Sequence, residues 1–173
     1  MRAMIGIRFS LYPMRGDFVP LILAAVKDLD RLVVEVEVDD VSTCLLGEEP
    51  HLFEALRVAF GRVAHSGAHV VLSATFSAGC PGEPDGDVCV PRAYDGPSGG
   101  EEGWSEEAYR LPDRVSAQFA LYPLGLSGYM DSIYSEIERA KQAGVVSGVS
   151  RPVCTHLYGA GAAERKSTRL NSR

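Results

Sequence analysis

The chain has 173 residues, 46% of them hydrophobic, which is enough for a packed core in one domain or two small ones. Its 17 Lys and Arg residues are outnumbered by 23 Asp and Glu residues, and no basic run precedes the C-terminal end, so nucleic acid is not expected as a partner. No segment approaches the roughly 20 apolar residues that span a membrane, and no secretory signal pattern opens the chain, which together predict a cytoplasmic protein.

The cysteines and histidines are too scattered to form a known metal-binding or redox motif. Neither a zinc site nor a disulfide framework is indicated, and no catalytic Cys–His pair is suggested by the spacing. We therefore expect no metal, no cofactor and no catalytic residues.

The first predicted element is a strand at residues 5–12, where apolar and polar side chains alternate. Its apolar face consists of Ile5, Ile7, Phe9 and Leu11. A helix follows, with Asp17 placed to cap it and apolar residues spaced three and four apart as far as Leu29. The change of period indicates a strand that packs against a helix.

Two more strands are predicted around a tight turn at Asp39–Asp40. The apolar residues of the strand before the turn are Val34, Val36 and Val38. After the segment VSTCLLG, an amphipathic helix at residues 50–66 ends at Gly67, and the alternating segment HVVLSATFS supplies a last strand. The order β-α-β-β-α-β defines the fold class as α+β, with residues 1–80 forming a ferredoxin-like repeat.

The pattern then starts again. Residues 81–113 are rich in Pro, Gly and acidic residues and are expected to form a linker. After them the segment RFSLYPM of residues 8–14 returns as QFALYPL at 118–124. We expect residues 114–159 to be a second ferredoxin-like copy, truncated because the counterparts of the second helix and last strand are missing.

The end of the second copy matches the first in detail. CTHLYG corresponds to STCLLG, so Thr155 takes the place of Thr43. Residues 160–173 are polar and lack periodicity, and the sequence ERKSTRLNSR resembles translated adapter or vector DNA. This tail is therefore expected to be disordered and artefactual.

The segments RFSLYPM, VDDVSTCLLG and ATFSAGCPGEPDGD together resemble the first repeat of the YkoF-type thiamin/hydroxymethylpyrimidine-binding family. The resemblance runs through most of residues 5–90 and more weakly through 114–159. It implies tandem ferredoxin-like, ACT-like repeats in a homodimer. It also implies non-catalytic binding of thiamin or its hydroxymethylpyrimidine precursor, in thiamin salvage or transport. The residues that it singles out are Ser42 and Thr43, with Thr155 as the counterpart in the second copy.

The chemistry of the first repeat agrees with such a ligand. An aminopyrimidine needs hydrogen-bond acceptors, hydrogen-bond donors and a flat surface on which to stack. The candidate ligand-binding residues are Ser10, Tyr12, Asp39, Asp40, Ser42 and Thr43. Glu35 and Glu37 could hold the cationic thiazolium ring of thiamin. A solvated strand face and a tight turn would explain the same residues.

Two other functions stay open. An ACT-like regulatory or dimerisation module would form a dimer that binds no pyrimidine. An enzyme acting on a pyrimidine precursor would use a carboxylate such as Asp40 or the thiol of Cys80, although the sequence shows no set of nucleophile, base and orienting group.

Overall fold

The computed structural model describes residues 5–78, 111, 115–123, 127–142, 147–151 and 154–159. The chain divides into two compact units, Met1–Leu111 and Pro112–Arg173, which are described one at a time. Apart from Leu111, the expected linker at 81–113 and tail at 160–173 lie outside the described residues, as does Cys80.

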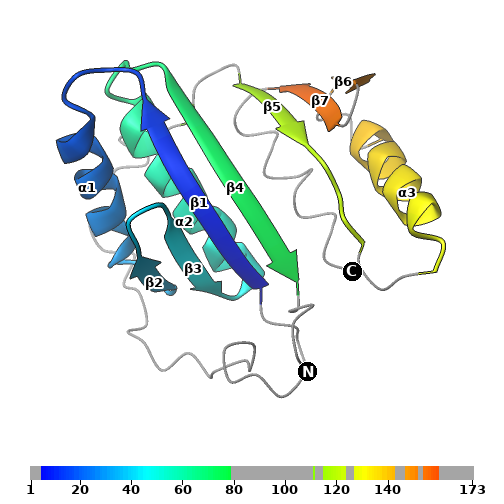
Figure 1. Ribbon diagram of the computed structural model, residues 1–173, viewed down its shortest axis with the longest axis horizontal. Helices are drawn as coiled ribbons and strands as arrows, with labels where there is room; N and C mark the ends of the chain where they lie inside the picture. The colour runs from blue at the N-terminus through cyan, green and yellow to red at the C-terminus, as the bar shows by residue number, and fades with distance from the viewer. Residues whose placement is uncertain are drawn as a thin grey trace. The chain divides into compact units, whose positions relative to one another are not determined.

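Unit 1 is a complete ferredoxin-like repeat (Figure 1). Its elements are β1 (Ile5–Pro13), α1 (Phe18–Leu29), β2 (Glu35–Val38), β3 (Thr43–Gly47), α2 (Glu49–Ala64) and β4 (Val70–Ala78). The strands form one sheet in the order β2-β3-β1-β4, and each pair is antiparallel. This is the β-α-β-β-α-β topology that the alternating and helical periods of the sequence predict.

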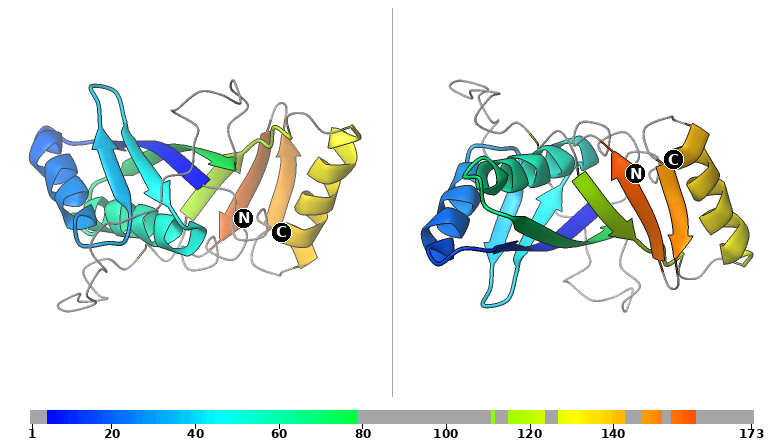
Figure 2. Two further views of the ribbon diagram at one scale, coloured as in Figure 1. Left: turned by 90° about the horizontal axis from the view of Figure 1, so that it is seen from below. Right: turned by 90° about the horizontal axis from the view of Figure 1, so that it is seen from above.

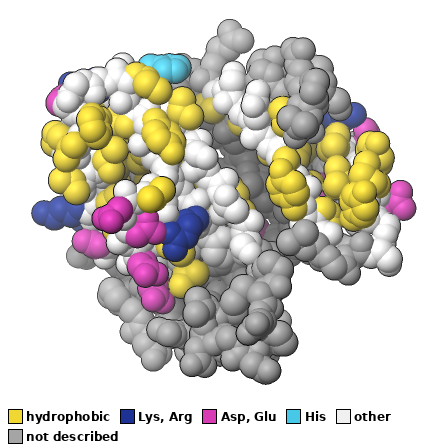
Figure 3. Space-filling view, in the orientation of Figure 1, with side chains coloured by type: hydrophobic (Ala, Val, Ile, Leu, Met, Phe, Trp, Pro, Cys, Tyr) yellow, Lys and Arg dark blue, Asp and Glu magenta, His cyan; other side chains and the backbone are white. Residues whose placement is uncertain are grey.

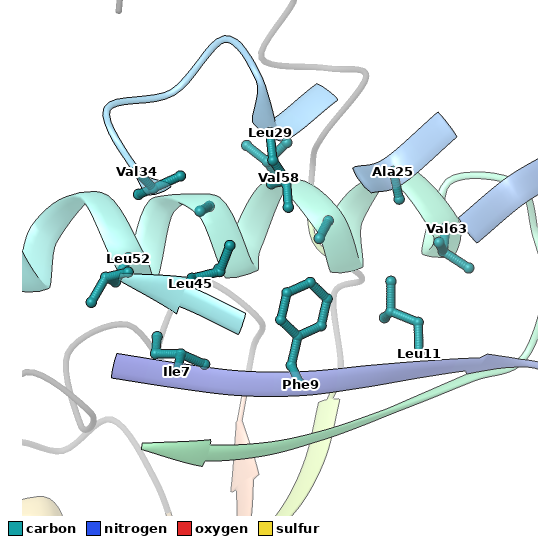
Figure 4. Close-up of a cluster of buried hydrophobic side chains, with 12 residues drawn as sticks. Ile7, Phe9, Leu11, Ala25, Leu29, Val34, Leu45, Leu52, Val58 and Val63 are labelled. Atoms are coloured by element: carbon teal, nitrogen blue, oxygen red, sulfur yellow. The ribbon is translucent and has the colours of Figure 1, made fainter. Parts of the chain in front are cut away.

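The core of unit 1 lies between one face of the sheet and the two helices (Figure 4). Ile7, Phe9 and Leu11 point from β1 toward the helices, as the alternation predicts. Burying apolar side chains of this size contributes roughly 1.5–3 kcal/mol each. Val38, the last residue of the edge strand β2, is 60% exposed, whereas Val34 is buried.

The start of α1 and the end of α2 test two predictions from the sequence. Asp17 occupies the N-cap position of α1 but makes no capping hydrogen bond, because its carboxylate binds the guanidinium of Arg15 instead. The predicted capping role of Asp17 is therefore wrong. Gly67 follows α2 with φ of +76°, a left-handed conformation that favours glycine, so the predicted end of this helix is confirmed.

Unit 2 repeats the first four of these six elements. Its elements are β5 (Val115–Phe119), α3 (Tyr129–Gln142), β6 (Ser147–Arg151) and β7 (Cys154–Gly159), and its strands are ordered β5-β7-β6. Phe119 pairs with Thr155 as Phe9 pairs with Thr43 in unit 1, which is the correspondence predicted from the sequence.

The second copy is incomplete within the described residues, which include no counterpart of α2 or β4. The side chain of Phe119 is only half-buried, whereas Phe9 at the equivalent position is 2% exposed. The inward face of β5 therefore lacks part of the cover that its counterpart in unit 1 has.

Candidate functional site

The face of the unit 1 sheet opposite α1 and α2 is mostly polar, and we refer to it as the open face. Its side chains are Arg8, Ser10, Tyr12, Glu35, Glu37, Ser42, Cys44, Leu46, Val71, Ser73, Thr75 and Ser77. One row across the sheet follows from the strand registers and runs Glu37, Cys44, Arg8, Thr75. In Figure 3 basic and acidic side chains meet on this side of unit 1, beside a surface of uncharged polar groups and backbone.

Asp39 builds the turn that joins β2 to β3. Its N–H donates to the carbonyl of Ser42 at 3.0 Å, and its Oδ1 accepts from the N–H groups of Val41 at 2.8 Å and Ser42 at 2.7 Å. Aspartate is common at such positions because its short side chain can satisfy nearby backbone donors. Residues 39–42 therefore have a defined backbone conformation.

Two side chains of β1 bind this turn. Arg8 donates from Nη1 to Oδ2 of Asp39 and, at 2.9 Å, to Oγ of Ser42. Ser10 donates from Oγ to the carbonyl of Val41 at 3.0 Å. These contacts hold the turn on the side of the sheet away from α2, where Figure 2 shows the tip of the β2–β3 hairpin.

The charges of this cluster are fixed by its hydrogen bonds. The N–H groups of Val41 and Ser42, and then the guanidinium of Arg8, lower the pKa of Asp39 to about 2. The hydrogen bond to Asp39 in turn raises the pKa of Arg8. Both side chains are about half exposed, so solvent screens their attraction, and the pair contributes more to position than to stability.

Cys44 lies opposite Arg8 in the β1–β3 ladder. Its partial burial raises the pKa of the thiol, although the positive charge of Arg8 acts in the other direction. The thiol is therefore neutral near pH 7 and a poor nucleophile.

The structure brings together three of the predicted site residues: Ser10, Asp39 and Ser42. Asp40 is exposed in the same turn, and Tyr12 lies on the open face of β1, beyond Ser10.

Thr43 lies apart from this group. It is 6% exposed and shares the helix-covered face of the sheet with Leu45, because alternate residues of β3 point to opposite faces. Thr155 holds the equivalent strand position in unit 2.

Arg8 is the member of the cluster that the sequence prediction of the site omitted. Its place on the polar face follows from the alternation of β1, but its contact with Asp39 joins residues 31 positions apart. The sequence signal that could have identified Arg8 is that it is the only basic residue of its strand, while the neighbouring hairpin carries Asp39 and Asp40.

Unit 2 carries different residues at the equivalent positions. Gln118 pairs with His156, where unit 1 pairs Arg8 with Cys44. In the hairpin, the Ser150–Thr155 pair matches the Val38–Thr43 pair of unit 1. The next pair toward the turn is Arg151 with Cys154. By this register Arg151 stands where unit 1 has Asp39. An arginine cannot accept the backbone hydrogen bonds that Asp39 accepts.

Over the described ranges, no three His, Cys, Asp or Glu side chains come close enough together to bind a metal ion. Among the helices that the structure describes, none has both the length and the apolar character needed to cross a membrane.

The fold and the open face define a class: a ferredoxin-like α+β repeat protein with a polar sheet face and a partial second copy. Comparison with known proteins specifies the class further. The YKOF-related Family matches residues 4–83 and 114–162, so the chain belongs to that family.

A curated relative supports the assignment. The chain is 39% identical over 146 residues to "Putative HMP/thiamine-binding protein YkoF" of Bacillus subtilis, a match that covers 83% of this chain and 70% of the relative.

The solved structures that match share less sequence identity with the chain. A hypothetical protein from Methanocaldococcus jannascii has 22% identity and a TM-score of 0.42, covering 48% of this chain and 87% of that one. A "putative thiamine biosynthesis/salvage protein" from Thermotoga maritima has 17% identity and a TM-score of 0.38, covering 42% of this chain and 81% of that one.

Proposed function

We propose that the chain binds thiamin or hydroxymethylpyrimidine on the open face of unit 1 and releases it unchanged. The observation that carries the proposal is the hydrogen-bonded group of Arg8, Asp39 and Ser42 on that face. The name of the Bacillus subtilis relative, which refers to binding of HMP and thiamine, supports the choice of ligand.

The open face offers what an aminopyrimidine needs. Both oxygens of Asp39 accept hydrogen bonds from the protein itself, so the exposed carboxylate of Asp40 is the better acceptor for the exocyclic amine. The hydroxyls of Ser42 and Ser73 can each donate a hydrogen bond to a ring nitrogen or accept one from a ligand N–H or O–H group. The ring of Tyr12 is 51% exposed and gives the pyrimidine a surface on which to stack.

The acidic edge of the same face suits thiamin in particular. Glu35 and Glu37 lie on the open-face side of β2, where carboxylates attract a permanent cation. Hydroxymethylpyrimidine lacks that cation. If these carboxylates hold the thiazolium, Glu37→Gln weakens thiamin binding and leaves hydroxymethylpyrimidine binding unchanged.

The proposal includes a role in thiamin salvage or transport, in the cytoplasm and as a homodimer. Within this proposal the protein is a carrier or sensor and needs no catalytic residue. Sedimentation of the whole chain tests the dimer, and cell fractionation tests the location.

Titration calorimetry of the whole chain with thiamin and with hydroxymethylpyrimidine, followed by mass spectrometry of the recovered ligand, tests the function. Saturable binding and unchanged ligand are expected. A chemically altered ligand would instead identify an enzyme, and a dimer that binds neither compound would identify a regulatory or dimerisation module.

A further inference from the structure

We propose that Arg8 is the positioning residue of this site, and that unit 1 alone has such a residue. By binding Asp39 and Ser42, Arg8 holds the β2–β3 turn against the open face and fixes the hydroxyl of Ser42 where a ligand can reach it. This inference rests on the proposed function, since it assumes that the ligand binds at the open face.

The contacts constrain nearly the whole turn. One nitrogen of Arg8, Nη1, bridges Asp39 at the start of the turn and Ser42 at its end. Ser10 binds the carbonyl of Val41 between them. Both donors come from the same face of β1, two residues apart, so a rigid central strand sets the position of the turn.

Apolar packing does not hold the turn in place. Val41, its one large apolar side chain, is 83% exposed and buries little surface. Beyond Phe9–Thr43, the last pair of the β1–β3 ladder, the position of the turn relative to β1 therefore depends on the polar contacts of Arg8 and Ser10. Because the Arg8–Asp39 pair is itself exposed, its loss should affect the order of the turn more than the stability of the fold.

The register of unit 2 removes both partners of this contact. Gln118 replaces Arg8 and Arg151 replaces Asp39, so at these two described positions neither the guanidinium nor the carboxylate of the unit 1 contact has a counterpart. The hairpin of unit 2 thus lacks the groups that fix the turn in unit 1. We expect a single ordered site per chain.

A double-mutant cycle on the whole chain tests the proposal. Arg8→Gln removes the guanidinium, and Asp39→Asn keeps an acceptor for the two backbone N–H groups but removes the charge. Each should raise the dissociation constant for hydroxymethylpyrimidine about tenfold, since ordering a loop at the moment of binding costs affinity. The dissociation constant of the double variant should not exceed that of the single variant with the lower affinity, because both changes break the same contact.

Arg15→Gln is the matched control. Arg15 forms a similarly exposed ion pair with Asp17, away from the open face. The Arg15→Gln variant should leave the dissociation constant unchanged and shift the melting temperature about as much as Arg8→Gln does. Amide exchange at Val41 and Ser42, followed by NMR, should become severalfold faster in Arg8→Gln and stay unchanged in Arg15→Gln.

Two results would overturn the inference: additive losses of affinity in the cycle, or unchanged amide exchange at Val41 and Ser42 in Arg8→Gln. Its failure is distinguishable from failure of the proposed function. If the unsubstituted chain binds neither thiamin nor hydroxymethylpyrimidine, the function is wrong, while amide exchange still decides whether Arg8 positions the turn.

Discussion

Phe9 lies directly opposite Thr43 in the β1–β3 ladder, and both side chains are buried on the helix-covered side of the sheet. Ser42, the residue just before β3, has a hydroxyl that accepts a hydrogen bond from Arg8 and donates to Asp39 on the other side. Two adjacent hydroxyl residues of one hairpin therefore face different environments. Substitutions at these two positions can show which face binds the ligand.

Ser42→Ala should weaken the binding of hydroxymethylpyrimidine. The change removes one neutral hydroxyl, whose hydrogen bond is worth about 0.5–1.5 kcal/mol, so the dissociation constant should rise roughly 2- to 10-fold. Titration calorimetry measures the change. Ser66→Ala is a suitable control, because Ser66 also uses its hydroxyl in hydrogen bonds but lies after α2, away from the open face. Equal affinity in the two variants would contradict the assignment.

Thr43→Val should leave ligand binding unchanged. Valine keeps the branched shape that a strand favours, and the hydroxyl that it removes lies on the helix-covered side. We expect the free energy of unfolding to change by less than about 1 kcal/mol. Calorimetry beside a thermal melt tests both statements. A clear loss of affinity with normal stability would place the ligand near the helices instead.

Asp39 should remain ionised down to strongly acidic pH. Its pKa is lowered from an ordinary value of 3.8 to about 2, so the stabilisation from its ionised form is complete above about pH 4 and is lost as the pH falls toward 2. NMR titration of the carboxyl group should give a midpoint near 2, with binding unaffected by this group between pH 5 and 8. A midpoint near the ordinary value would show that the turn is not organised by Asp39 in solution.

The two units should respond differently to the loss of equivalent phenylalanines. Phe9→Ala removes a fully packed side chain and should cost about 3–5 kcal/mol, whereas Phe119→Ala removes a half-buried one and should cost less than half as much. Native-state amide exchange measures each cost separately, in β3 for Phe9 and in β7 for Phe119. Equal losses would mean that the inward face of unit 2 is covered as fully as that of unit 1.

Much of the fold could be predicted from the sequence, because its signals are local. The alternation in β1 and the glycine after α2 depend on near neighbours in the chain, and both were confirmed. The role of Asp17 could not be predicted, since a capping carboxylate and an ion pair with Arg15 are both compatible with the residue type. The choice between them depends on the path of the chain between β1 and α1.

The site was harder to predict because it joins separate elements. The contact of Arg8 with Asp39 requires the pairing of β1 with β3 and the closure of the turn. The face of Thr43, in contrast, could have been inferred. Thr43 and Leu45 are two residues apart in a strand and must share a face, and a buried leucine marks the core side.

The most direct test of the proposed binding face is an NMR titration of the whole chain with hydroxymethylpyrimidine, in which backbone amide shifts identify the residues near the ligand. We predict that the largest changes occur in the turn of residues 39–42 and at Arg8, Ser10 and Ser73, with saturation at one ligand per chain. Changes concentrated in α1 and α2 or in unit 2, or no saturable change at all, would contradict binding at the open face of unit 1.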